Sequence, residues 1–187
     1  GAVPGHGDDV FVTKAGASAI LAAASSNLNS LTLSRTLTFT NWDTLLTASN
    51  VTILSNGVIA LPPAFTASQM SNNVSIVCTS LLVEAGGKID VNGKGFAGAT
   101  ASGNPGQGPG AGLYDAAGGG YGGGGGHGGW GGNRPFGTAP IFISGPPYGA
   151  ANAPVAPGSG GGQAYGGPAG AGGGAIRIAA ADLVTVN

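Results

Sequence analysis

The chain has 187 residues, a formal net charge of −1, and only 7% charged residues. Its six cations are scattered, so the sequence does not indicate the basic surface of a nucleic-acid-binding protein. Apolar residues make up 42% of the chain, enough for a hydrophobic core, but no run reaches the ~20 apolar residues of a membrane-spanning helix. Because the sequence starts at Gly1 without Met, we expect a mature exported protein that is secreted or displayed on the cell surface.

Residues 1–97 contain short apolar and β-branched runs separated by Asn, Gly, Ser and Pro, a pattern typical of β-strands. An apolar–Thr/Ser–apolar triplet recurs at intervals of 20 and 23 residues, and a short turn and a second apolar run follow each copy. The triplets start at Leu31, Val51 and Val74, and the second runs start at Leu37, Val58 and Leu81. This repeat predicts an all-β fold, a parallel β-solenoid in which each coil stacks on the one before. A Greek-key β-sandwich is the alternative, because it also has short strands at regular spacing.

The triplets also predict which side chains lie inside. Neighbouring residues of a strand point to opposite faces, so the outer residues of each triplet are expected inside and the middle ones, such as Thr32 and Thr52, outside. Asn56–Gly57 predicts a tight turn within one coil. The single Cys78 lies in an apolar run, which predicts a buried free thiol.

The composition changes abruptly after residue 97. Residues 98–174 hold 31 of the 40 Gly and 9 of the 12 Pro. The glycines recur with a period of three, because both residues between successive members are Gly in the series Tyr121, Gly124, His127, Trp130 and Asn133. Similar series occupy 104–113 and 165–174. Polyproline II geometry has three residues per turn and no internal hydrogen bonds. We therefore predict polyglycine II-type helices whose amides pair with neighbouring helices.

These patterns divide the chain into three parts. We predict a solenoid part over 1–97, a glycine-rich polyglycine II-type part over 98–174, and C-terminal strands over 175–187 that return to the solenoid. Within the glycine-rich part we expect three helices of roughly 10 to 14 residues and an extended surface loop over 135–157. Apolar side chains are expected to shield the helices from water: Tyr114, Tyr121, Trp130, Phe136, Ile141, Phe142, Ile143, Tyr148 and Tyr165.

The Gly-Gly-X series within 103–174 resembles the packed polyglycine helices in the distal tips of phage tail-fibre adhesins and in glycine-rich antifreeze proteins. Short β-coils combined with a glycine-rich insertion that ends in Gly-Gly-Gly-Ala-Ile-Arg-Ile are similar to repeats of large exported bacterial surface proteins. Both resemblances imply a rigid, fibrous module without diagnostic catalytic residues.

Residues with catalytic or metal-binding chemistry are few. Glu84 and Asp90 are the only close acidic pair in the solenoid part, and we interpret them as solvated surface groups rather than glycosidase carboxylates. His6, Asp8 and Asp9 could supply metal ligands, but their glycine neighbours favour a solvated terminus. We therefore predict no enzyme activity, no catalytic residue, no cofactor and no metal site.

Contacts with a partner or ligand are predicted instead at the third positions of the glycine series. These candidates are Tyr121, His127, Trp130, Asn133 and Tyr165. Asn50 and Asn73 each begin an Asn-X-Ser/Thr sequence and are candidate glycosylation sites.

The leading hypothesis is a non-catalytic structural subunit of an extracellular filament or surface assembly, such as a fimbrium, whose partners are copies of itself. Exposed strand edges would join the copies head to tail into an open filament. The alternative is a cell-adhesion tip that binds a receptor or a cell-surface glycan through its aromatic third positions. An ice-binding protein is a third option.

Overall fold

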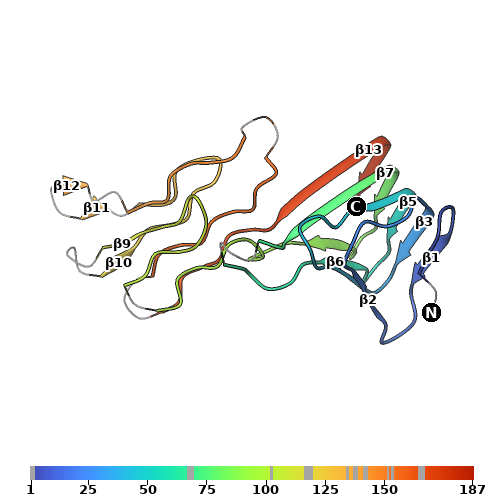
Figure 1. The fold of residues 1–187 in the computed structure, drawn as a ribbon, viewed down its shortest axis with the longest axis horizontal. Coiled ribbons are helices and arrows are strands. Elements are labelled where there is room, and N and C mark those ends of the chain that lie inside the picture. The colour runs from blue at the N-terminus through green and yellow to red at the C-terminus, as the bar shows by residue number, and fades with distance from the viewer. Residues whose placement is uncertain are drawn as a thin grey trace. The chain divides into compact units, whose positions relative to one another are not determined.

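The computed structural model describes residues 3–66, 70–101, 103–115, 120–133, 135–136, 139–140, 143–150, 152, 154–163 and 167–187. The regular structure of these residues consists of β-strands, and the strands of the two largest sheets pair in parallel (Figure 1). The all-β class expected from the sequence is therefore confirmed. In the described part of the chain, no helix is long and apolar enough to cross a membrane.

The chain divides into two compact units. The first comprises Gly1–Pro62, Asn73–Asp90 and Ile176–Asn187, and the second comprises Pro63–Asn72 and Val91–Ala175. The second unit thus contains the glycine-rich part together with the short stretch Pro63–Asn72, which composition alone does not separate from its neighbours.

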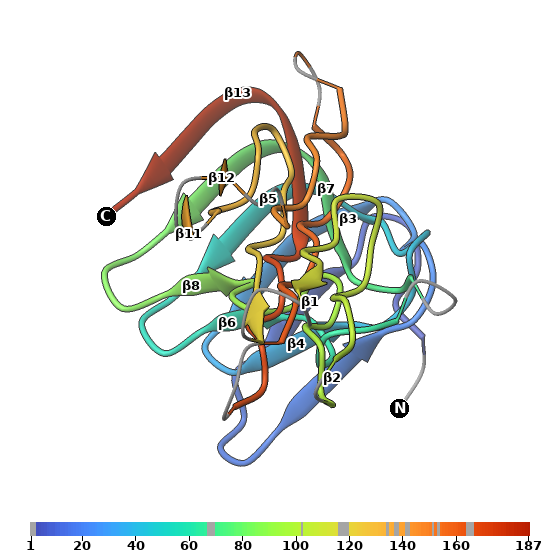
Figure 2. The ribbon, with the colours of Figure 1, turned by 90° about the vertical axis from the view of Figure 1, so that its left-hand side faces the viewer.

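The first unit is built around two sheets that the chain visits in turn. The first sheet has the strand order β1 (Asp9–Val12), β3 (Leu28–Leu33), β5 (Leu46–Ile53), β7 (Asn73–Val83) and β13 (Ala175–Val186). The second sheet has the order β2 (Ser18–Leu21), β4 (Thr36–Phe39), β6 (Val58–Ala60) and β8 (Lys88–Asp90). Each strand up to β8 therefore lies beside the strand two places earlier in the chain. In Figure 2 the colours of the first sheet run from blue β1 to green β7 and red β13.

Parallel pairing places equivalent apolar residues of the first sheet beside one another. Two columns of inward-facing side chains result: Val10–Leu31–Val51–Leu81 and Val12–Leu33–Ile53–Val83. Leu33 and Ile53 are 0% exposed. The middle residues Thr32 and Thr52 are half-buried on the other face. The predicted alternation within the triplets is therefore confirmed.

The longer strands of the first sheet bend where this alternation skips a residue. In β5, every second residue on either side of Ser49 and Asn50 is buried, but these two neighbours are both exposed. Two consecutive outward residues require a change of backbone direction, because a straight strand alternates strictly. Leu46–Ala48 is therefore a separate arm of β5, and the triplet pattern misses it.

The repeat length differs from the prediction in the third coil. Val51 pairs with Leu31, 20 residues earlier, as expected, but on its other side it pairs with Leu81, 30 residues later, rather than with Val74. The interval is longer because the chain enters the second unit at Pro63–Asn72 before β7 begins. The sequence repeat also misses the first coil, β1 and β2, which has no Thr-centred triplet at the predicted spacing.

Asn56–Gly57 forms the predicted tight turn between β5 and β6. Asn56 has φ 66°, a left-handed conformation that Asn tolerates better than most residues, and Gly57 N donates to Leu54 O at 2.8 Å. A Cβ on Gly57 would lie 2.5 Å from Leu33 O in the neighbouring coil. Glycine is therefore required because the stacked backbones approach closely there.

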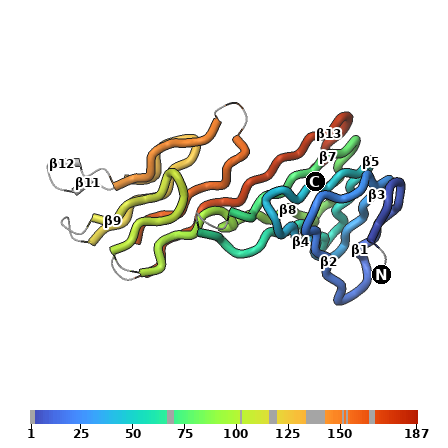
Figure 3. Tube along the Cα trace, in the orientation of Figure 1, coloured from blue at the N-terminus to red at the C-terminus, as the bar shows by residue number. Residues whose placement is uncertain are grey.

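The second unit consists mainly of extended segments that lie side by side and exchange main-chain hydrogen bonds (Figure 3). The three consecutive amides of Gly160, Gly161 and Gly162 donate to three different segments. Their acceptors are Gln107 O at 2.9 Å, Gly170 O at 3.0 Å and Gly123 O at 2.9 Å, respectively. The lateral main-chain pairing expected for the glycine-rich part is therefore present.

Bonds between the same two segments recur every three residues. Phe96 N donates to Gly158 O at 3.0 Å, and Ala99 N, three residues later, donates to Gly161 O at 3.0 Å. These two segments therefore run parallel with a three-residue step. Two short antiparallel pairs complete the strands of this unit: β9 (Tyr114–Asp115) with β10 (Tyr121–Gly122), and β11 (Pro135–Phe136) with β12 (Ala139–Pro140).

Two of the predicted helices are wrong in length, because the chain folds back within them. Gly124 N donates to Gly132 O at 2.9 Å within the 121–133 series, and Gly106 N donates to Gly112 O at 2.9 Å within the 104–113 series. In the second case the chain reverses near Gly108, which has φ 99°. A glycine series permits a straight helix and a reversal equally well, so the period alone does not distinguish them.

The surface loop predicted over 135–157 is wrong in part. Ile143 and Ser144 are buried, and Ile143 O accepts a hydrogen bond from Leu113 N at 2.8 Å. This stretch therefore belongs to the network of extended segments. The sequence analysis also misses Phe65 and Phe96, which are buried and pack with their ring centroids 4.7 Å apart.

Candidate functional site

The predicted contact residues do not share one ridge, because the chain reverses between Gly124 and Gly132. Tyr121 lies in β10 and is half-buried, whereas Trp130 is 68% exposed at the reversal. Asn133 has a local structural role, since its Oδ1 accepts a hydrogen bond from Ile143 N at 3.2 Å. Tyr165 lies outside the described residues.

His127 is the candidate with the most structured surroundings. Its ring meets the ring of Tyr148 edge to face, with centroids 4.9 Å apart and planes at 89°, and its carbonyl accepts a hydrogen bond from Tyr148 N at 2.7 Å. His127 Nε2 is buried and has no hydrogen-bond partner among the described residues. Burial raises the pKa of the Tyr148 hydroxyl, which donates to Pro157 O.

A cavity of about 430 Å³ lies beside these two rings. Pro147, Gly149 and Pro154 line it together with His127 and Tyr148. Aromatic and proline rings around a cavity offer flat apolar faces, and the buried imidazole nitrogen offers one polar contact. The sequence analysis named His127 but treated Tyr148 only as apolar cover, because their 21-residue separation hides the contact.

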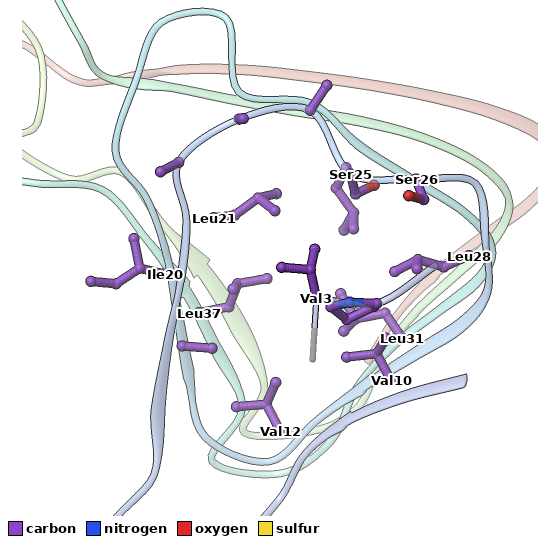
Figure 4. Close-up of a pocket in the computed structure, with 16 residues that line it drawn as sticks. Val3, Val10, Val12, Ile20, Leu21, Ser25, Ser26, Leu28, Leu31 and Leu37 are labelled. Atoms are coloured by element: carbon purple, nitrogen blue, oxygen red, sulfur yellow. The ribbon is translucent and has the colours of Figure 1, made fainter. Parts of the chain in front are cut away.

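A second cavity, of about 550 Å³, opens at the β1–β2 end of the first unit (Figure 4). Its lining is almost entirely apolar and includes Val10, Val12, Leu21 and Leu37. These side chains point toward one another in Figure 4, whereas Ile20 points away. The cavity exists because the inward columns of the two sheets end at β1 and β2 without a covering layer.

The residues considered as metal ligands or catalytic acids make ordinary surface contacts. Asp90 forms an ion pair with Lys88 at 3.2 Å, and Glu84 Oε2 accepts a hydrogen bond from Ser55 N at 3.4 Å. Asp8 Oδ2 accepts a hydrogen bond from Gly5 N at 2.7 Å. No three His, Cys, Asp or Glu side chains of the described residues are grouped to hold a metal ion.

Asp9 lies at the edge of a short polar ladder on the outer face of the first sheet. Its Oδ1 accepts hydrogen bonds from Ser30 Oγ at 2.5 Å and Asn29 Nδ2 at 2.8 Å. These bonds, with Ser30 contributing most, hold the pKa of the Asp9 carboxyl below its usual value. The ladder continues through Asn50, which pairs in register with Ser30.

The two candidate glycosylation sites differ in accessibility. Asn50 is exposed on the outer face of β5, whereas Asn73 is half-buried and its Nδ2 donates to Trp42 O at 3.2 Å. Cys78 is a buried free thiol, as predicted, and burial raises its pKa.

Comparisons of this chain with protein-family models, with curated proteins and with solved structures give no match. The functional argument therefore depends on the residues and their geometry.

Proposed function

We propose that this protein is a non-catalytic structural subunit of an extracellular filament or surface assembly. In this proposal the first unit is a parallel β-solenoid, and the second is a bundle of short polyglycine II-type helices. Together they form a module whose rigidity comes mainly from main-chain pairing. Its partners are further copies of the same chain.

Parallel pairing and in-register columns support the solenoid. The pairs from β1 to β7 and from β2 to β8 are parallel, and successive strands alternate between the two sheets. A Greek-key sandwich is built from antiparallel strands. The observed alternation is what stacked coils produce.

The amides of Gly160–Gly162 support the polyglycine II-type bundle. A helix with three residues per turn points successive amides in three directions, and these three amides reach three different segments. The same neighbour is met again after three residues, since Gly158 N donates to Gly173 O at 2.8 Å and Gly161 N to Gly170 O at 3.0 Å.

This amide network is the observation that carries the structural role. Glycine loses more conformational freedom on folding than any other residue, so an ordered glycine network needs many hydrogen bonds to offset that entropy. Such a network holds the backbone in place while presenting few side chains. It therefore suits a rigid spacer or scaffold better than a catalytic site.

Electron microscopy and analytical ultracentrifugation of the purified chain test this proposal together. We expect filaments or regular oligomers whose proportion rises with protein concentration. A chain that sediments as a monomer at millimolar concentration, without filaments on the grid, would contradict the assembly role.

A glycan-binding tip is the second candidate, because Trp130 is 68% exposed and the 430 Å³ cavity beside His127 and Tyr148 has aromatic walls. Exposed aromatic faces stack on sugar rings. A glycan array probed with the wild type, Trp130→Ala and the exposed-residue control Val155→Ala tests it. Binding that Trp130→Ala alone loses would favour this candidate, and no binding by any of the three would remove it.

A further inference from the structure

The two edges of the five-stranded sheet carry exposed apolar side chains. Phe11 on β1 is 65% exposed, and Val184 and Val186 on β13 are 48% and 72% exposed. Unpaired strand edges readily pair with other strands, and proteins commonly protect them with Lys or Pro. Neither β1 nor β13 contains Lys or Pro, and the last four residues of β13 are uncharged.

The register of β13 follows from its last hydrogen bond. Asn187 N donates to Val83 O at 3.0 Å, as Glu84 N donates to Ile53 O at 2.9 Å one strand earlier. In that earlier case Ile53 and Val83 are the paired residues. By the same offset Val186 lies beside Val83, and β13 runs in the direction of β7 (Figure 2).

Both inward columns of the first sheet therefore continue onto β13. Val184 extends the column that passes through Leu81, and Val186 extends the column that passes through Val83. At the opposite edge the same two columns begin at Val10 and Val12, where the 550 Å³ apolar cavity opens (Figure 4). The two ends of the sheet thus expose the same pair of columns, and each lacks the layer that the other end could supply.

We propose that the β13 edge of one molecule binds the β1 edge of a second copy, so that the parallel sheet continues from molecule to molecule. This inference rests on the proposed assembly function and names its interface. A heterologous contact of this kind repeats without closing and produces a filament. The ladder hydrogen bonds set the register, and the continued apolar columns provide the buried surface.

The second sheet is one strand shorter at this end, because it ends at β8 while the first sheet continues to β13. A copy docked on β13 would therefore leave a space about one strand wide, ~4.8 Å, beside β8. Val3 and Pro4 lie at the β1–β2 cavity, and Val3 is 91% exposed. In the docked arrangement these two residues are at the junction and can fill that space.

Disulfide trapping tests the interface directly. Phe11 pairs with Thr32, and its outward column continues through Thr52 and Leu82, so by the β13 register Thr185 is the next residue in that column. Adjacent strands place Cα atoms within the ~4.4–6.8 Å range of a disulfide. Phe11→Cys and Thr185→Cys are made in separate full-length chains that also carry Cys78→Ala, and the two chains are mixed under mild oxidation.

We expect the mixed Phe11–Thr185 disulfide as the main product. The matched control is Thr52→Cys, which belongs to the same column but has paired strands on both sides, so it should give no cross-link with Thr185→Cys. Assembly accompanied mainly by Phe11–Phe11 or Thr185–Thr185 disulfides, or by no disulfide, would overturn this interface and leave the assembly function standing. A monomeric chain without cross-links would overturn both.

A charge at the β13 edge gives an independent measurement. Val186 is mostly exposed in the single molecule, so Val186→Lys should leave the unfolding midpoint unchanged while abolishing assembly in sedimentation. The matched variant Val186→Ile should assemble like the wild type. Undiminished assembly of Val186→Lys would overturn the proposed interface.

Discussion

The tight packing of the glycine segments makes Gly160→Ala a sharp test of the second unit. A Cβ at Gly160 would overlap the carbonyl group of Ala97 and lie 2.7 Å from Gly98 N. Gly160 also donates to Gln107 O at 2.9 Å and accepts from Gly112 N at 3.0 Å. The added methyl therefore cannot be accommodated unless a neighbouring main-chain segment moves.

The expected cost combines two contributions. Overpacking of a tightly packed site costs about 1–3 kcal/mol, and the displaced segment also loses one main-chain hydrogen bond, about 1 kcal/mol. We expect Gly160→Ala to destabilise the network by about 2–4 kcal/mol. The matched control is Gly173→Ala, because no atom lies within 4 Å of the Cβ position there. The control should be neutral or stabilise the protein by up to about 1 kcal/mol through the unfolded state.

Hydrogen exchange read by mass spectrometry is the assay, since it reports local opening of the amides at 158–162. A loss of 2 kcal/mol corresponds to exchange about 30-fold faster. Equal protection in Gly160→Ala and Gly173→Ala would refute the close approach of the segments. Wild-type amides that exchange as fast as those of an unfolded peptide would refute the network itself.

Three further predictions concern individual side chains. Asn72 is 0% exposed and its Nδ2 donates to two main-chain carbonyls at 2.8 Å each, so Asn72→Ala should cost about 2–4 kcal/mol in denaturant unfolding, because two buried acceptors lose their donor; an unchanged midpoint would contradict this. The buried Cys78 thiol, whose pKa is raised, should react with a thiol reagent at pH 8 many times more slowly in the folded protein than in denaturant, and equal rates would show that β7 opens readily. The Asp9 carboxyl has a lowered pKa in the folded protein, so its stabilising contribution is present above its unfolded pKa and is lost as the pH falls through the folded value; unfolding midpoints measured between pH 6 and pH 2 should fall less for Asp9→Asn than for wild type.

Part of the fold could be predicted from local patterns. The triplet at Leu31 and its repeat at Val51 stack as expected, because an alternating strand with one buried face has the same signature wherever it lies. The Asn56–Gly57 turn is also local, since its backbone conformation depends on the residue types themselves. The third coil could not be predicted, because the excursion of Pro63–Asn72 into the second unit changes the spacing without changing the strand pattern.

The candidate site shows the same division. The period-three series correctly predicts lateral amide pairing, yet it places Tyr121, Trp130 and Asn133 on one ridge that the reversal of the chain breaks. The contact of His127 with Tyr148 and the open columns at β1 and β13 come from segments distant in the sequence. No local pattern records such distances.

The amino-acid sequence by itself determined the β-strands of the first unit, the need for glycine pairing in the second, and the near absence of charge. These properties depend on a few neighbouring residues, because side-chain alternation and amide direction are local. Only the tertiary structure decided which segments pair, where the glycine series reverse, and which strands are left at the sheet edges. These features depend on main-chain hydrogen bonds between distant residues, and glycine, which has no side chain, leaves almost no trace in the sequence of the partner it meets.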